Sequence, residues 1–306
     1  MNKFAIIGDS TCDLTTEQRQ KHNIDYARML VSWVDKDGKT QERHADLDWK
    51  EYSVKEYYDI LRNGFRIITS QITEQEFDEV FGRHLEKGED ILFIACSSGL
   101  SAGIHLAERL ARDKYAKKYP NQKIIIVDSL ISAMGQGLML LYAAEKRDEG
   151  QSMEEIAEYL NKNRLCYLQV ATVESLEYLK RAGRVKASSA FFGNIFGVKP
   201  MLVSDIKGVN HAVEKVKGRR NSLIRCAEMV RDTVIDAEHQ TIYVQHADAR
   251  QEDVDLVVSK IKEMCNFKEI VVQYLGPIIG CSTGPGTFGI YYVGREETVS
   301  GDAEWF

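Results

Sequence analysis

No apolar run in this chain of 306 residues approaches the length of a membrane-spanning helix. No GxxxxGK[ST] loop is present, which argues against ATP binding. None of the six cysteines forms a CxxC pair, so we expect reduced thiols and no metal site. The chain enters an apolar run directly after Met1-Asn2-Lys3, so we expect no secretory signal and a cytoplasmic protein.

The composition is that of an ordinary globular protein, with 44% hydrophobic and 28% charged residues. The net charge of −6 argues against nucleic acid as the main partner. The length predicts about two domains. Up to residue 165 the pattern alternates strands and helices, among them a strand over residues 26–34 and helices over residues 134–147 and 153–162. This order predicts a mostly parallel sheet covered on both faces. Residues 166–295 predict a second, α+β domain, with strands expected over residues 167–173, 201–203, 212–216, 242–246, 270–274 and 288–293. Residues 296–306 are an acidic tail that is a candidate for disorder.

Four short apolar runs of the first domain each lead directly into a hydroxyl-rich turn. Buried parallel strands read as such runs, and ligands of parallel sheets bind beyond the carboxyl ends of the strands. Hydroxyls and free helix N–H groups suit an anionic oxygen, so the four turns together predict an anion site. The runs are Phe4–Ile7, Arg66–Ile68, Ile91–Ala95 and Ile124–Val127, and the turns are Gly8–Thr11, Thr69–Gln71, Cys96–Ser101 and Asp128-Ser129.

Each of these turns also has a purely structural interpretation. Ser101 is expected at the start of a helix over residues 101–118, where it would either cap the helix or hold an anion. Thr69 and Ser70 are equally suited to cap a helix that begins at Glu74. An enzyme that acts on a small phosphorylated or acyl substrate would use the same loops. A serine hydrolase is a rival hypothesis, although no histidine has an obvious claim to be its base.

Outside these turns, the segment of residues 188–203 is unusually apolar for a stretch with two glycines and a proline. Its side chains are either core or the wall of an apolar ligand cavity, namely Phe191, Phe192, Ile195 and Phe196. The basic groups Lys180–Arg184 and Lys217–Arg220 form either a solvated face or the rim of an anion site. The short-pitch pairs His44/Asp46 and His246/Asp248 are expected in loops or at strand ends rather than on a metal.

Several motifs in this order and spacing resemble the DegV family of fatty-acid-binding proteins over about residues 3–295. They are Asp9–Asp13, Thr69–Gln71, Ser97–Ser101, Val127–Ser129, Leu179–Val185, Lys199-Pro200, His246–Asp248, and Gly276-Pro277 through Gly284–Gly286. The resemblance implies a Rossmann-like first domain, a layered α+β second domain, and one long-chain fatty acid between them with its tail buried. No cofactor or catalytic residue is implied.

The resemblance also implies roles for single residues. Thr69 and Ser101 match hydroxyls that hold the carboxylate, and Arg184 matches an arginine linked to function with a partner protein. That partner is a bacterial fatty-acid kinase, which makes an acyl-phosphate for phospholipid synthesis. The position two residues before Gly-Pro-Gly is usually histidine but here is Ser282, which donates a hydrogen bond without a charge. The expected ligand-binding hydroxyls are Thr69, Ser70, Ser97, Ser98, Ser101 and Ser282.

Overall fold

The computed structural model describes residues 3–186 and 197–300, and the chain divides into two compact units. The first unit contains most of the N-terminal half, and the second contains most of the C-terminal half together with a short segment from the N-terminal half. The first comprises Met1–Glu51, Ile67–Arg164 and Gly276–Ile278; the second comprises Tyr52–Arg66, Leu165–Leu275 and Ile279–Phe306.

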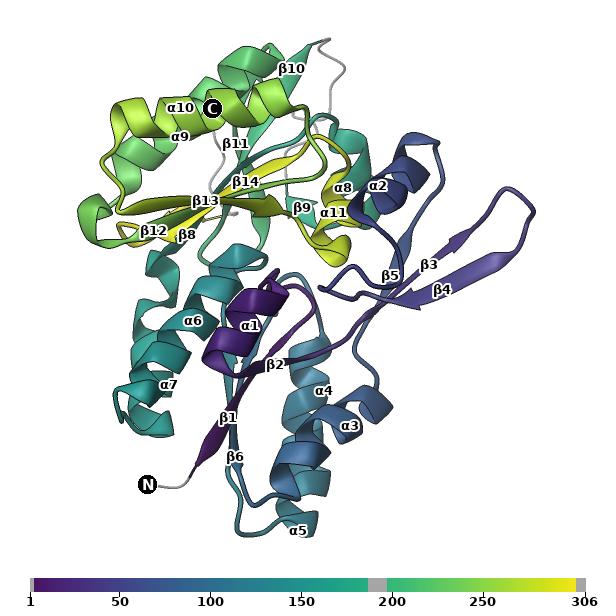
Figure 1. The fold of residues 1–306 in the computed structure, drawn as a ribbon, viewed down its shortest axis with the longest axis vertical. Helices are drawn as coiled ribbons and strands as arrows, with labels where there is room; N and C mark the ends of the chain where they lie inside the picture. The colour runs from purple at the N-terminus through teal and green to yellow at the C-terminus, as the bar shows by residue number, and fades with distance from the viewer. Residues whose placement is uncertain (1–2, 187–196, 301–306) are drawn as a thin grey trace. The chain divides into compact units, whose positions relative to one another are not determined.

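A four-stranded parallel sheet in the order β2-β1-β6-β7 forms the centre of the first unit (Figure 1). Every residue of β1 and β6 is buried, which explains why these strands read as unbroken apolar runs. The strands are β1 (Phe4–Asp9), β2 (Ile24–Ala27), β6 (Asp90–Ala95) and β7 (Ile124–Asp128). The predicted parallel sheet is confirmed.

Helices cover both faces of this sheet, with α3 and α4 on one side and α6 and α7 on the other (Figure 1). The ring of Phe93 on β6 packs against Phe77 and Phe81 of α3, with ring centroids 5.6 and 5.4 Å apart. The helices are α1 (Thr16–His22), α3 (Glu74–Leu85), α4 (Gly103–Leu110), a π-helical stretch (Ala111–Tyr115), α5 (Ala116–Lys118), α6 (Met134–Asp148) and α7 (Met153–Asn163).

A second, antiparallel sheet of the first unit corrects two expectations. The single strand expected over residues 26–34 is divided into β2 and β3 (Leu30–Val34). The division occurs because the backbone N–H of Met29 donates to Ser10 Oγ at 2.7 Å instead of to a neighbouring strand. β3 pairs with β4 (Thr40–His44) and with β5 (Ile68–Ser70). The run before Thr69 therefore does not belong to the parallel sheet, and Thr69 and Ser70 lie within β5 rather than in a turn.

The second unit contains a seven-stranded mixed sheet in the order β13-β12-β14-β8-β10-β11-β9. Helices α9 and α10 lie over one face, where residues such as Leu223, Val257 and Ile290 form the core (Figure 1). The strands are β8 (Tyr167–Thr172), β9 (Val185–Lys186), β10 (Val198–Ser204), β11 (Asn210–Lys217), β12 (Thr241–His246), β13 (Glu269–Tyr274) and β14 (Phe288–Val293). The expected layered α+β fold is confirmed.

The remaining helices are α2 (Val54–Arg62), α8 (Leu176–Ala182), α9 (Arg219–Thr233), α10 (Gln251–Met264), α11 (Pro277–Thr283) and the 3-10 turns Arg164–Cys166 and Ala237–His239. Helix α2 belongs to the second unit, where Tyr58 Oη donates to the carbonyl of Leu275 at 2.8 Å. At the acidic C-terminal end, the N–H of Ile206 donates to the carbonyl of Val299 at 2.9 Å. Backbone hydrogen bonds therefore hold the start of the expected tail, and residues 301–306 lie outside the described range.

Candidate functional site

The loops that follow β1, β6 and β7 meet at the carboxyl edge of the parallel sheet. The N–H of Cys96 donates to Asp9 Oδ2 at 2.8 Å, which joins the first two loops. The N–H of Ser98 donates to Asp128 Oδ1 at 3.1 Å, and the N–H of Ser97 donates to the carbonyl of Ile131 at 3.0 Å. Three of the four hydroxyl-rich turns are therefore adjacent, as the parallel sheet requires.

The serine turn, residues 97–101, is closed by its own hydrogen bonds. The carbonyl of Ser97 accepts from the N–H groups of Leu100 and Ser101, both at 3.0 Å, and Ser97 Oγ accepts from the N–H of Gly99 at 3.1 Å. With Ser98 bound to Asp128, four successive N–H groups have internal partners. The expectation that the N–H groups of this turn are open to an anion is therefore wrong for residues 98–101.

Ser101 does not cap the helix, because the residue at the cap position is Ala102, whose side chain has no hydrogen-bonding group. Ser101 Oγ instead accepts from the N–H of Gly103 at 3.3 Å. This contact uses a lone pair of the oxygen and leaves the hydroxyl proton for another acceptor. Ser101 thus retains what an anion site needs, a neutral donor at the end of a parallel sheet.

Thr69 and Ser70 do not cap the next helix either, since Thr73 Oγ1 accepts from the N–H of Glu76 at 3.1 Å. The segment after β5 nevertheless runs close to the serine turn. A Cβ atom placed on Gly103 would lie 3.5 Å from Ser101 Oγ and 3.7 Å from Ile72 Cδ1. The capping interpretation is wrong for both residues, and their role in binding stays a prediction.

The sequence from Gly99 to Gly103 also has the GxSxG spacing of a nucleophile elbow, a signal that sequence reasoning missed. In such an elbow the serine sits on a strained turn directly after a strand. Here Ser101 comes six residues after the end of β6 and is not among the described residues with positive φ. The geometry is that of an ordinary loop before a helix.

Ser282 lies in the second unit, within α11, a helix that was not predicted from the sequence. Burial raises the pKa of the neighbouring Cys281 thiol to about 11, against hydrogen bonds with Tyr57 and Ser282. Pro277 at the first position of α11 is the signal that would have located this helix.

Arg184 follows the left-handed Gly183 that ends α8 (φ 65°). Its Nη1 donates to the carbonyl of Ala182 at 2.8 Å, and its own carbonyl accepts from Asn210 Nδ2 at 3.1 Å. The expected cavity wall of Phe191, Phe192, Ile195 and Phe196 lies outside the described residues.

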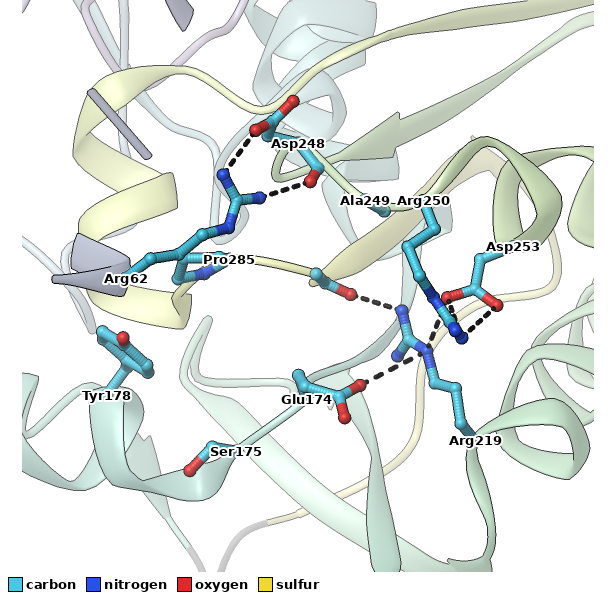
Figure 2. Close-up of a pocket in the computed structure, with 11 residues that line it drawn as sticks. Arg62, Glu174, Ser175, Tyr178, Arg219, Asp248, Ala249, Arg250, Asp253 and Pro285 are labelled. Atoms are coloured by element: carbon cyan, nitrogen blue, oxygen red, sulfur yellow. Dashed lines mark hydrogen bonds and ion pairs between the residues drawn. The ribbon is translucent and has the colours of Figure 1, made fainter. Parts of the chain in front are cut away.

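A pocket of about 410 Å³ in the second unit was not predicted (Figure 2). Its wall carries three arginines and three carboxylates, and the helices α9 and α10 both begin there without a side-chain cap. The residues that carry charge are Arg62, Arg219, Arg250, Glu174, Asp248 and Asp253. We call these six residues the charged cluster.

Ion pairs inside the charged cluster compensate its charges. Arg62 holds Asp248 through Oδ2 and the backbone carbonyl, both at 2.6 Å. Arg219 Nε lies 3.5 Å from Glu174 Oε2 and 3.4 Å from Asp253 Oδ2 (Figure 2). The solvated-face interpretation of residues 217–220 is wrong for Arg219, whose side chain is only 13% exposed, and holds for the exposed Lys217 and Arg220.

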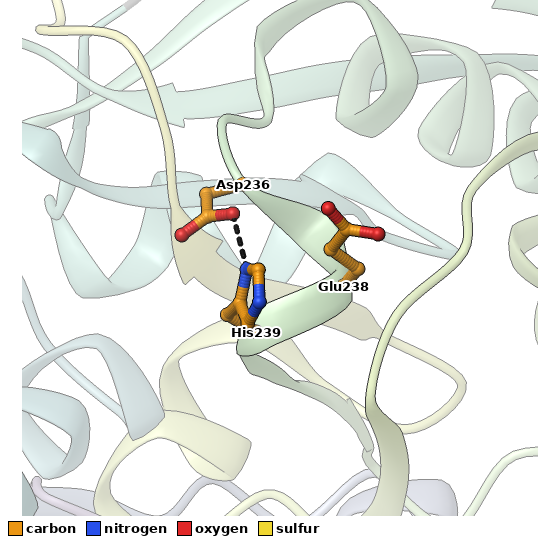
Figure 3. A group of neighbouring side chains, drawn as sticks. All are labelled: Asp236, Glu238 and His239. Atoms are coloured by element: carbon orange, nitrogen blue, oxygen red, sulfur yellow. Dashed lines mark hydrogen bonds and ion pairs between the residues drawn. The ribbon is translucent and has the colours of Figure 1, made fainter.

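The His-Asp pairs are loop and strand-end residues, as expected. Asp46 Oδ1 accepts from Tyr26 Oη at 2.9 Å, and His246 Nδ1 accepts from the N–H of Ala249 at 3.1 Å. Among the described residues, one group of ligand-type side chains is close enough to hold a metal, namely Asp236, Glu238 and His239 (Figure 3). All three are exposed, and His239 Nδ1 is already 2.6 Å from Asp236 Oδ1.

Comparison with known proteins identifies the family. A family model described as "Uncharacterised protein, DegV family" matches residues 3–295. This chain belongs to the DegV family. The DegV domain-containing protein CPE0026 of Clostridium perfringens is 34% identical over 296 residues, which cover 96% of this chain and 98% of the relative.

Solved DegV structures confirm the fold. DegV of Bacillus subtilis, described as a fatty acid binding protein, is 27% identical with a TM-score of 0.79. A DegV family protein of Thermus thermophilus, whose structure is described as showing fatty acid binding, is 26% identical with a TM-score of 0.80. Each comparison covers 96% of this chain and 100% of the other. None of the helices in the described part of this DegV protein is long and apolar enough to cross a membrane.

Proposed function

We propose that this DegV protein binds a long-chain fatty acid, holding the carboxylate through the hydroxyls of Thr69 and Ser101 and burying the acyl chain. Ser70, Ser97, Ser98 and Ser282 remain the further candidates for the head-group site. Two solved relatives above 25% identity are described as fatty-acid-binding proteins, and both align over 96% of this chain.

The single observation that supports the head-group site best is the hydrogen bonding of Ser101. Its oxygen accepts from Gly103 N at 3.3 Å, which orients the hydroxyl while its proton stays available. A carboxylate is an acceptor-only group, so a hydroxyl whose lone pair is already used is a suitable partner. Thr69, the second proposed donor, lies in β5 of the same unit, and the segment that follows β5 comes close to Gly103 at Ile72.

Affinity and orientation come from different parts of such a ligand. A tail of about fifteen methylenes contributes about 12 kcal/mol of gross transfer free energy when it is buried. Each hydroxyl bound to the carboxylate contributes about 1.5–3 kcal/mol. The tail therefore supplies most of the affinity, and the hydroxyls determine which end of the lipid is recognised.

The direct test is mass spectrometry of the purified protein after denaturation. We expect a fatty acid to be released in nearly stoichiometric amount, because a buried tail dissociates slowly. A second sample, stripped of lipid and offered stearic acid, should take it up again. A ligand-free spectrum together with no uptake of stearic acid would refute the proposal.

We also propose that the bound acid is presented to a fatty-acid kinase, with Arg184 on the surface that meets the partner. Arg184 is exposed and its backbone is fixed by Asn210, which suits a contact residue. The loaded protein, a bacterial fatty-acid kinase and ATP should then yield acyl-phosphate, whereas Arg184→Ala should bind lipid normally and yield less product. Equal product from both proteins would remove Arg184 from the proposal.

The protein itself acts as a carrier, and incubation of the protein alone with acyl esters should give no turnover.

A further inference from the structure

Asp9 is the last residue of β1 and lies at the centre of a buried hydrogen-bond network. Its Oδ1 lies 2.9 Å from Thr11 N and 2.5 Å from Thr11 Oγ1, and its Oδ2 accepts from Cys96 N at 2.8 Å. Thr11 Oγ1 also lies 2.6 Å from Gln136 Oε1, and Gln136 Nε2 donates to the carbonyl of Ile94 at 2.9 Å. The carboxyl group therefore ties the loop after β1 to β6 and to α6.

The protons in this network can be counted. The two oxygen–oxygen contacts, from Asp9 to Thr11 and from Thr11 to Gln136, need one proton each. The threonine hydroxyl supplies only one proton. Rotating the amide of Gln136 does not help, because it would place Oε1 against the carbonyl oxygen of Ile94. A neutral carboxyl group supplies the second proton, so that each contact has a hydrogen of its own and the threonine proton is not shared between two acceptors.

We propose that Asp9 is a neutral carboxylic acid in the folded protein, and that its proton keeps a negative charge away from the adjacent serine turn. The carboxyl proton passes to Thr11, the threonine proton to Gln136, and an amide proton to Ile94. The second half of the inference rests on the proposed function, because only an anionic ligand is sensitive to that charge. Asp9 is thus a positioning residue that acts through Cys96 and the serine turn.

The surroundings favour the neutral form. Burial raises the pKa of Asp9, against the hydrogen bonds from Thr11, Cys96 and Gln136. Burial also raises the pKa values of the Cys12 and Cys96 thiols. The titratable and charged groups that act on this cluster come from the strand ends and α1: Cys12 and Asp13 after β1, Cys96 after β6, Asp128 at the end of β7, and Arg19 of α1.

Ionisation of Asp9 and binding of a carboxylate then oppose one another. Ser97, the first residue of the serine turn, directly follows the Cys96 N–H that Asp9 holds. By linkage, a bound carboxylate raises the pKa of Asp9 by the same factor by which ionised Asp9 weakens binding. The sign for stability follows from the raised pKa: this contribution is present in acid and is lost as the pH rises through the folded pKa.

The test of the proton is carbon NMR of protein labelled at the aspartate carboxyl carbons, recorded at neutral pH. We expect the chemical shift of Asp9 to be that of a protonated acid. Asp25 is the internal control and should show the shift of a carboxylate, because in spite of its burial the hydrogen bond to His84 lowers its pKa. The resonance is assigned by its loss in Asp9→Asn. Should that variant not fold, through-bond correlation to the Asp9 amide in the wild type assigns it. A carboxylate position for Asp9 at neutral pH overturns the inference.

The test of the coupling is the affinity for stearic acid across the pH range in which the protein stays folded, with octadecan-1-ol as the uncharged control. We expect the affinity for the acid to fall about tenfold over the Asp9 titration and that for the alcohol to stay constant. A profile that departs from the NMR titration overturns the coupling. Binding of neither lipid refutes the proposed function and leaves the proton result intact.

Discussion

The two polar regions of this protein differ in how their donors are used. At the carboxyl edge of the parallel sheet the hydrogen-bond donors are neutral hydroxyl and backbone N–H groups, and Ser101 keeps a proton to donate. In the charged cluster of the second unit, each of the three arginines already faces a carboxylate. An anion entering the cluster must compete with those carboxylates for every arginine donor except the buried Arg219 Nη1, whereas an anion at Ser101 adds a bond without breaking one. Charge density is therefore a poorer guide to an anion site than unused donors.

The largest expected effect tests the uncharged side of this comparison. The double substitution Thr69→Ala with Ser101→Ala should weaken stearic acid binding about 100-fold, since two hydroxyl bonds to a charged group contribute about 3 kcal/mol together. Competition with a fluorescent fatty acid measures the loss, and octadecan-1-ol is the matched control because its head group is uncharged. Equal losses for acid and alcohol would show a general disturbance, and unchanged affinity would move the head-group site elsewhere.

The second prediction tests the charged side. Arg219→Met should lower the free energy of unfolding by about 2 kcal/mol, because it leaves Asp253 with only the exposed Arg250 as a partner and removes the hydrogen bond to the carbonyl of Gly286. Glu174 keeps its ion pair with Lys199. Its affinity for stearic acid should remain that of the wild type. Denaturant unfolding measures the first quantity and competition binding the second.

The matched control for Arg219 is Arg112→Met. Arg112 also pairs with an aspartate, Asp113, but the two side chains are 71% and 54% exposed. Its removal should change the stability by less than about 0.5 kcal/mol. Loss of fatty-acid affinity in Arg219→Met without loss of stability would mean that the charged cluster, rather than the sheet edge, recognises the ligand.

The sequence predicted the elements well where one strand or helix corresponds to one periodic run. The helices over residues 134–148 and 153–163 and the strands β8 to β14 other than β9 were expected within a few residues. The break between β2 and β3 was not, because no glycine or proline marks it. It arises from contacts with distant residues. The N–H of Met29 donates to the hydroxyl of Ser10, and the N–H of Arg28 donates to the carboxylate of Glu76.

The candidate site was predicted in the same uneven way. The meeting of the β1, β6 and β7 loops follows from parallel order, which the βα alternation already contains. Two of the serine-turn N–H groups, those of Ser97 and Ser98, bond to Ile131 and Asp128, which are residues of another loop. The charged cluster combines residues from Arg62 to Asp253, and no local pattern joins positions so far apart. The chemical character of each turn could thus be predicted from the sequence, whereas the distant residues that bond to it could not.

The smallest predicted effect compares two histidines, and it sharpens the difference between buried and exposed charge. His84 lies between Asp25 (Nε2 to Oδ2, 3.3 Å) and Glu89 (Nδ1 to Oε2, 2.7 Å), and its side chain is 15% exposed. The hydrogen bond to Asp25 raises the pKa of His84, and that to Glu89 adds to it against the effect of burial. The stabilisation is complete below the unfolded pKa of about 6.5 and is lost as the pH rises through the higher folded pKa.

His84→Gln should therefore flatten the decline in stability as the pH rises above the unfolded pKa of about 6.5, measured as the denaturant midpoint. His239→Gln is the matched control. Asp236 raises the pKa of His239 as well, but this pair is exposed and solvent screens it, so the variant should keep the wild-type profile. The pKa values of Asp25 and Glu89 are lowered further below this pH range in spite of burial, chiefly by hydrogen bonds with His84, so their titration does not contribute to the change. If both variants flatten the profile equally, the buried His84 contacts contribute no more to the pH dependence of stability than the exposed contact of His239.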